Sequence, residues 1–160
     1  MEAKKLLKPM MRVLVVVYLL FLMKVILLKN ISSWRMLSKV FKEVSHNGQT
    51  YSSHNFVPFK TIFGYIMTES NGRILLDNLA GNIALFIPLG VLVGLLTSKT
   101  KNLTFVTAVG LGVSLFLELM QLLLRIGSFD VDDLILNTIG ALLGAVFVSL
   151  IRKKTPFMDN

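Results

Sequence analysis

Cysteine is absent from the 160-residue sequence, which excludes disulfide bonds, thiolate chemistry and cysteine-based metal sites. Histidine is scarce as well: His46 and His54 both lie outside the apolar segments, so those segments contain no metal-binding histidine pair. Charged residues make up only 16% of the chain, whereas soluble globular proteins contain about a quarter. We therefore expect no large soluble domain.

Apolar residues are abundant instead, and they come in long blocks. They account for 54% of the chain, and the mean hydropathy is +0.69. A membrane-spanning helix needs about 20 predominantly apolar residues. Four segments approach that length, at about residues 10–28, 78–96, 103–124 and 133–151. The sequence thus predicts an all-α membrane protein, with residues 1–160 forming one domain built on a bundle of four transmembrane helices.

The net charge of +8 comes from basic residues that flank the spans instead of forming one stripe. These flanking residues are Lys4, Lys5, Lys8, Arg12, Lys99, Lys101, Arg152, Lys153 and Lys154. This distribution is typical of cytoplasmic flanks, so we expect a multi-pass protein of the cell membrane with both termini in the cytoplasm. Nucleic acid is not an expected partner, because its binding sites are continuous basic patches.

The connection over residues 29–76 is then an external loop with an amphipathic pattern. Apolar residues recur at helical spacing in its first part, with basic residues between them: Ile31, Trp34, Leu37, Phe41 and Val44. Such a helix is expected in the membrane interface, either as an anchor or as a basic platform for anionic headgroups or cell-wall polymers. A second short apolar face follows around Pro58, formed by Phe56, Phe59, Ile62, Phe63 and Ile66.

Polar side chains inside the spans are the most informative residues, because burying an unpaired polar group in hydrocarbon is costly. On three spans they recur at steps of three or four residues, which places each set on one helical face. The sets are Asn78 and Asn82, then Ser114, Glu118 and Gln121, then Asp130, Asp133 and Asn137. Because successive spans alternate in direction, all three sets lie toward the external side. The sequence therefore predicts an outer-face polar pocket.

Each of these polar groups also has a purely structural interpretation. The amides would serve as interhelical hydrogen-bond donors and acceptors. Asp130 would be the N-cap of the fourth span, and Asp132 and Asp133 would be favourable charges in its first turn. Glu118 would be protonated or paired with an arginine.

Small residues predict close packing between the spans. Glycines spaced four apart allow two helix backbones to approach closely. The pairs are Gly90 with Gly94 and Gly140 with Gly144, and Gly110 and Gly112 are candidates on the third span.

Four ordered segments of the chain resemble the VanZ-like membrane proteins. They are Asn55-Phe-Val-Pro58-Phe59, Asp77-Asn78-Leu-Ala-Gly81-Asn82-Ile-Ala-Leu-Phe86-Ile-Pro88-Leu-Gly90, Ser114-x-x-x-Glu118-x-x-Gln121 and Asp130-Val-Asp-Asp133-Leu-Ile-Leu-Asn137-Thr-x-Gly140. The resemblance implies an association with resistance to glycopeptide antibiotics of the teicoplanin type in Gram-positive bacteria. Together with the pattern of the spans, it gives ten candidate binding residues: Asn55, Pro58, Asn78, Asn82, Ser114, Glu118, Gln121, Asp130, Asp133 and Asn137.

The leading hypothesis is a binding protein of the cell envelope. Its outer pocket would engage a membrane lipid, a lipid-linked cell-wall precursor or the glycopeptide itself. Amides donate to phosphate or sugar oxygens, and carboxylates accept from amines or hydroxyls or bind a divalent cation. No cofactor is expected, although a divalent cation and a homodimer stay open.

The alternative hypothesis is an intramembrane hydrolase or transferase that acts on a lipid-linked substrate. In that case Glu118 would be the general base, and Asp130 and Asp133 would hold a metal. The sequence contains no nucleophile elbow and no metal-binding histidine pair, so an enzyme is the less favoured interpretation. A transporter is less favoured still, because no inverted repeat is evident.

Overall fold

The computed structural model describes residues 2–28, 54–67, 72–97, 102–124 and 126–154. Its helices are α1 (Glu2–Leu28), α3 (Lys60–Met67), α4 (Gly72–Leu96), α5 (Asn102–Leu124) and α6 (Val131–Lys154). All except α3 are long and apolar enough to cross a membrane. The chain is therefore a multi-pass membrane protein, and the predicted all-α bundle of four spans is confirmed.

The helices match the predicted spans closely and extend beyond several of them. Helix α5 begins one residue before the predicted span, whereas α1 begins at Glu2 and contains Pro9 in its first turns. The predicted amphipathic helix around Trp34 lies outside the described residues, as does most of the 29–76 connection. The second apolar face forms α3 and the turn before it, and its phenylalanines Phe56, Phe59 and Phe63 are exposed.

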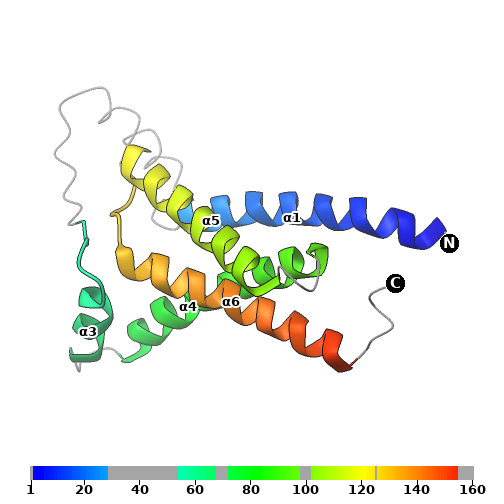
Figure 1. Ribbon diagram of the computed structural model, residues 1–160. Coiled ribbons are helices and arrows are strands. Elements are labelled where there is room, and N and C mark those ends of the chain that lie inside the picture. Colours follow the sequence, from blue (N-terminus) through cyan, green and yellow to red (C-terminus); the bar gives the residue numbers. More distant parts are fainter. Residues whose placement is uncertain (1, 29–53, 68–71, 98–101, 125, 155–160) are drawn as a thin grey trace.

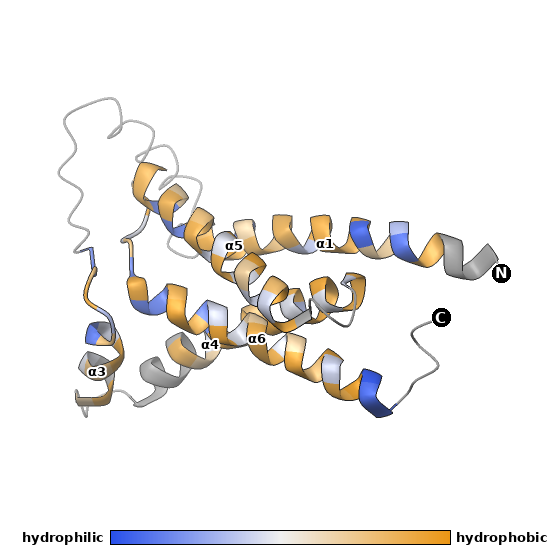
Figure 2. Cartoon of the chain, in the orientation of Figure 1, coloured by the Kyte–Doolittle hydropathy of each residue, from blue (hydrophilic) through white to orange (hydrophobic). Residues whose placement is uncertain are grey.

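Helix α1 begins and helix α6 ends at one end of the bundle, as an even number of spans requires (Figure 1). At the other end, α5 finishes, α4 and α6 begin, and α3 packs beside α4 and α6. We call this second end the polar end, because hydrophilic residues mark the first turn of α6 there (Figure 2). At the opposite end, the Arg152 guanidinium donates to the carbonyls of Leu95 and Thr97, and so satisfies carbonyls at the end of α4.

Helices α4 and α6 share the most extensive interface in the bundle, and glycines bring their backbones together. A Cβ at Gly90 would lie 2.1 Å from the carbonyl oxygen of Ala141. At Gly140 and Gly144, a Cβ would lie 2.3 Å from a carbonyl oxygen of α4. The predicted role of these three glycines is confirmed. Gly112 is different, since a Cβ there would meet nothing within 4 Å.

Helix α1 packs more loosely than the other spans. Leu22 is its fully buried anchor, and the Tyr18 hydroxyl donates to the Leu85 carbonyl of α4 at 2.7 Å. Most of its other apolar side chains are exposed, including Val13, Val17 and Leu20. Exposure of this kind is expected for the lipid-facing surface of a spanning helix.

Candidate functional site

Polar side chains from α4, α5 and α6 meet at the polar end of the bundle. Hydrogen bonds join α5 to α6 and α4 to α6, so the predicted faces converge in the structure. We call this group the polar column, and its members are Asn82, Ser114, Glu118, Asp133 and Asn137. Asn78 belongs to α4, but its side chain lies outside the described residues.

The inner part of the polar column is a buried pair on α5 and α6. The Asn137 amide nitrogen donates to Ser114 Oγ at 2.9 Å, and both residues are almost inaccessible, at 3% and 0% exposure. The other end of the same amide is Asn137 Oδ1, which is buried and has no hydrogen-bond partner among the described residues. A buried, unbonded acceptor costs about 1–3 kcal/mol. This position therefore favours a bound hydrogen-bond donor.

Glu118 lies one helical turn from Ser114, toward the polar end, and is only 2% exposed. Its Oε2 accepts the backbone N–H of Asp130 at 3.0 Å. The carboxylates of Asp130 and Asp133 are close enough to repel that of Glu118 electrostatically. Glu118 forms no ion pair within the described part of the chain. The surroundings of Glu118 are thus rich in acceptors and would attract a donor or a cation.

Asn82 connects α4 to this group. Its amide nitrogen donates to Asp133 Oδ1, which ties α4 to the first turn of α6. Asp133 lies one turn before Asn137 on the same face of α6. The column therefore runs from the start of α6 inward to the unbonded Asn137 oxygen.

Asn55 joins the segment before α3 to the start of α6. It pairs with Asp130 through a backbone bridge, donating its N–H to Phe129 O and accepting that of Val131. Its amide nitrogen also donates to Asp130 Oδ1 at 2.9 Å, while the hydroxyl of Thr61 donates to Asp130 Oδ2 at 2.7 Å. The predicted N-cap role of Asp130 is present as well, because Oδ1 accepts the backbone N–H of Asp132 at 2.8 Å. Asn55 is thus a positioning residue.

Asp132 is the residue that sequence reasoning missed. As well as being a first-turn charge of α6, it is fully buried and accepts three backbone N–H groups at the start of α3. These come from Phe59, from Thr61 at 2.7 Å and from Ile62 at 3.1 Å. Phe59 has a φ of 66°, an uncommon conformation for a bulky residue. Asp132 therefore holds α3 and this turn against α6.

Besides Asn55 and Asp130, two further predicted binding residues lie outside the polar column. Pro58 is exposed in the turn before α3 and contributes no polar group to the site. Gln121 turns toward α1, where its amide nitrogen donates to the Ile26 carbonyl at 3.0 Å. Gln121 follows Glu118 by three residues, so the helical period predicts that both lie on the same broad face of α5. Gln121 is nevertheless close enough to α1 for its long side chain to reach that helix.

The chemistry available in the column is acceptance of hydrogen bonds. Both carboxylate oxygens of Asp130 and of Asp132 already bind protein donors. Within the described ranges, no three His, Asp or Glu side chains lie close enough together to hold a metal ion. Ser114 pairs with Asn137, and the described histidine, His54, accepts the Phe129 N–H through Nδ1. Ser114 is thus paired with an amide and not with a general base.

Comparison with known proteins gives one family match. A family model described as VanZ/LLP1 matches residues 15–152, a range that contains every member of the polar column together with Asn55, Asp130 and Asp132. No curated protein and no solved structure matches the chain.

Proposed function

The chain belongs to the VanZ/LLP1 family, and from this premise we propose that it modulates resistance to teicoplanin-type glycopeptides at the bacterial cell envelope. It does so by binding an envelope component or a lipid-linked cell-wall precursor at the polar column. The protein lies in the cell membrane with both termini in the cytoplasm, so the polar end faces outward.

The observation that carries this proposal is the unbonded, buried Asn137 Oδ1 one turn inward from Asp133. Glu118 adds a second buried acceptor without a basic partner in the described ranges. Ligands that satisfy such groups carry amines or hydroxyls, as headgroups and sugars of the cell envelope do. Purely structural hydrogen bonding between helices would leave neither group in need of a donor.

The outward orientation is supported by the basic flanks at the end that holds the termini. It is testable by labelling, because the chain has no cysteine. Ser128 is exposed at the polar end, and Lys153 is exposed at the opposite end. We expect a membrane-impermeant maleimide to label S128C in intact cells and K153C only after permeabilisation. The opposite pattern would place the column on the cytoplasmic side and overturn the proposal.

The role of the column is tested by changing its charge while keeping its shape. Glu118→Gln keeps an oxygen for the Asp130 N–H and removes the negative charge, and Asp133→Asn does the same at the Asn82 contact. We expect either variant, expressed in a susceptible Gram-positive host, to lose protection against teicoplanin completely, because the donor-bearing ligand is no longer held. The measurement is the inhibitory concentration, normalised to the amount of protein in the membrane.

The matched control is Thr138→Val, which alters the residue next to Asn137. Its hydroxyl donates only to the Leu134 carbonyl of its own helix, so protection should persist. Full protection by both E118Q and D133N would exclude the column as the binding site.

A further inference from the structure

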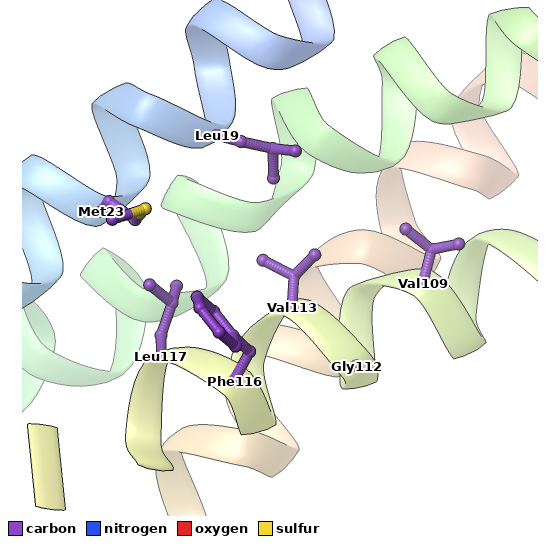
Figure 3. A pocket seen from close by; sticks show the side chains of 7 residues that line it. All are labelled: Leu19, Met23, Val109, Gly112, Val113, Phe116 and Leu117. Atoms are coloured by element: carbon purple, nitrogen blue, oxygen red, sulfur yellow. The ribbon is translucent and has the colours of Figure 1, made fainter. Parts of the chain in front are cut away.

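A cavity of about 370 Å³, which we call the groove, lies between α1 and α5, away from the polar column. Leu19 and Met23 line it from α1, and residues between Val109 and Leu117 line it from α5. Figure 3 shows these side chains facing one another across the cavity. The lining is entirely apolar, and Gly112 contributes open space in place of a side chain.

The α1 side of this groove lies within the depth of one leaflet of the bilayer. Met23 and Leu19 precede the last residue of α1 by five and nine positions, which is about 8 and 14 Å along the helix. The hydrocarbon of one leaflet is about 15 Å thick. On α5, Leu117 and Val109 precede the last residue by 7 and 15 positions, about 10 and 22 Å. The groove therefore starts alongside the acyl chains of the leaflet at the polar end and reaches past the middle of the bilayer on its α5 side.

A hydrogen bond joins α1 to α5 on the side of the groove that lies nearer the polar end. Gln121 on α5 donates to the Ile26 carbonyl of α1 at 3.0 Å. Gln121 lies one turn past Leu117, and Ile26 lies one turn past Met23, so this hydrogen bond separates the groove from the surface. A ligand therefore reaches the groove sideways, from the bilayer.

The volume excludes a helix as the occupant. One turn of a helix about 10 Å wide occupies roughly 400 Å³, more than the whole groove holds. A volume of 370 Å³ is instead at the lower end of the range for small-molecule sites. An extended hydrocarbon chain fits this space along the axis of α5.

We propose that the groove binds one acyl chain of an anionic phospholipid from the leaflet at the polar end. Lys24 follows Met23, is exposed, and lies four residues, or about 6 Å, before the end of α1. Its flexible stem extends to the interface, where the ammonium pairs with the lipid phosphate. This site goes beyond the proposed function, because it needs no ligand in the polar column.

The test is lipid retention by the purified protein. The delipidated chain is incubated with palmitoyl-oleoyl phosphatidylglycerol in mild detergent and studied by native mass spectrometry. We expect one retained lipid per chain. Gly112→Phe places a ring in the groove and should lower its occupancy at least about tenfold. Lys24→Gln should reduce the preference for phosphatidylglycerol over phosphatidylcholine.

Two controls make the result specific to the groove. Leu111→Phe adds bulk at an exposed position of α5 and should retain the lipid, and so should Glu118→Gln, which alters only the polar column. Val109→Phe fills the groove from its other end and provides a second variant should G112F misfold. Absence of retained lipid on the wild-type chain, unchanged retention in both filled variants, or a dimer that G112F dissociates would each overturn the proposal.

Discussion

Replacing Gly140 with leucine should separate α4 from α6 and prevent the bundle from folding. The Cβ alone would lie 2.3 Å from the backbone oxygen of Ile83 and 3.0 Å from Cβ of Phe86. A helix backbone cannot move aside as a flexible side chain does. The cost should therefore exceed the roughly 1–3 kcal/mol of ordinary core overpacking. We expect no monodisperse protein in size-exclusion chromatography of detergent extracts, and Gly144→Leu should behave alike.

Gly112→Leu is the matched comparison, because it makes the same substitution on a neighbouring span. A Cβ at Gly112 meets nothing within 4 Å, so this variant should elute and melt like the wild type. Normal folding of G140L would show that α4 and α6 do not pack at the described distance. The outcome also bears on the site, since the Asn82–Asp133 hydrogen bond joins the same two helices.

These glycines illustrate what sequence reasoning can and cannot give. A spacing of four predicts that Gly140 and Gly144 share a face, and the structure places that face against α4. The same pattern cannot distinguish Gly110, where a Cβ would lie 2.3 Å from the Ala141 Cβ, from Gly112, which opens onto a cavity. The sequence shows that a glycine has no side chain. Which neighbouring group packs into that space depends on the rotation of each helix about its axis, and the sequence does not give this rotation.

The convergence of polar residues could be predicted because it needs only helical period and alternating direction. Asn82, Glu118 and Asp133 follow from those two rules. Gln121 obeys the same rules, but its long side chain reaches the Ile26 carbonyl on the neighbouring helix. The structural interpretation of Asp130 as an N-cap holds, because that interaction is local. Local geometry and the convergence of helical faces are thus readable in the sequence, while the partner of an individual long side chain is not.

Asp132 shows the limit most clearly. Its partners are about 70 residues away in sequence, and they are backbone N–H groups, which every residue except proline offers. No side-chain pattern marks them. In the sequence, Asp132 stands between Asp130 and Asp133, and nothing there distinguishes a buried acid from a solvated charge in the first turn of a helix.

The largest electrostatic effect should follow from Asp132→Asn, which preserves shape while removing an acceptor. One oxygen of Asp132 accepts the N–H groups of Thr61 and Ile62, so an amide NH₂ in that place would face two donors. If the NH₂ group took the place of the other oxygen instead, it would face the Phe59 N–H. Leaving buried donors unsatisfied costs about 1–3 kcal/mol each, so we expect segment 54–67 to detach from α6 with a loss of about 3 kcal/mol.

Limited trypsin digestion of the purified protein measures this detachment. Lys60 is exposed at the start of α3, but cleavage needs the backbone to open locally. About 3 kcal/mol corresponds to cleavage faster by roughly a hundredfold. Lys153, at the far end of α6, provides an internal control whose cleavage should stay unchanged. Equal cleavage rates at Lys60 in D132N and the wild type would mean that α3 is held by its other contacts, namely Asn55 and Thr61 with Asp130.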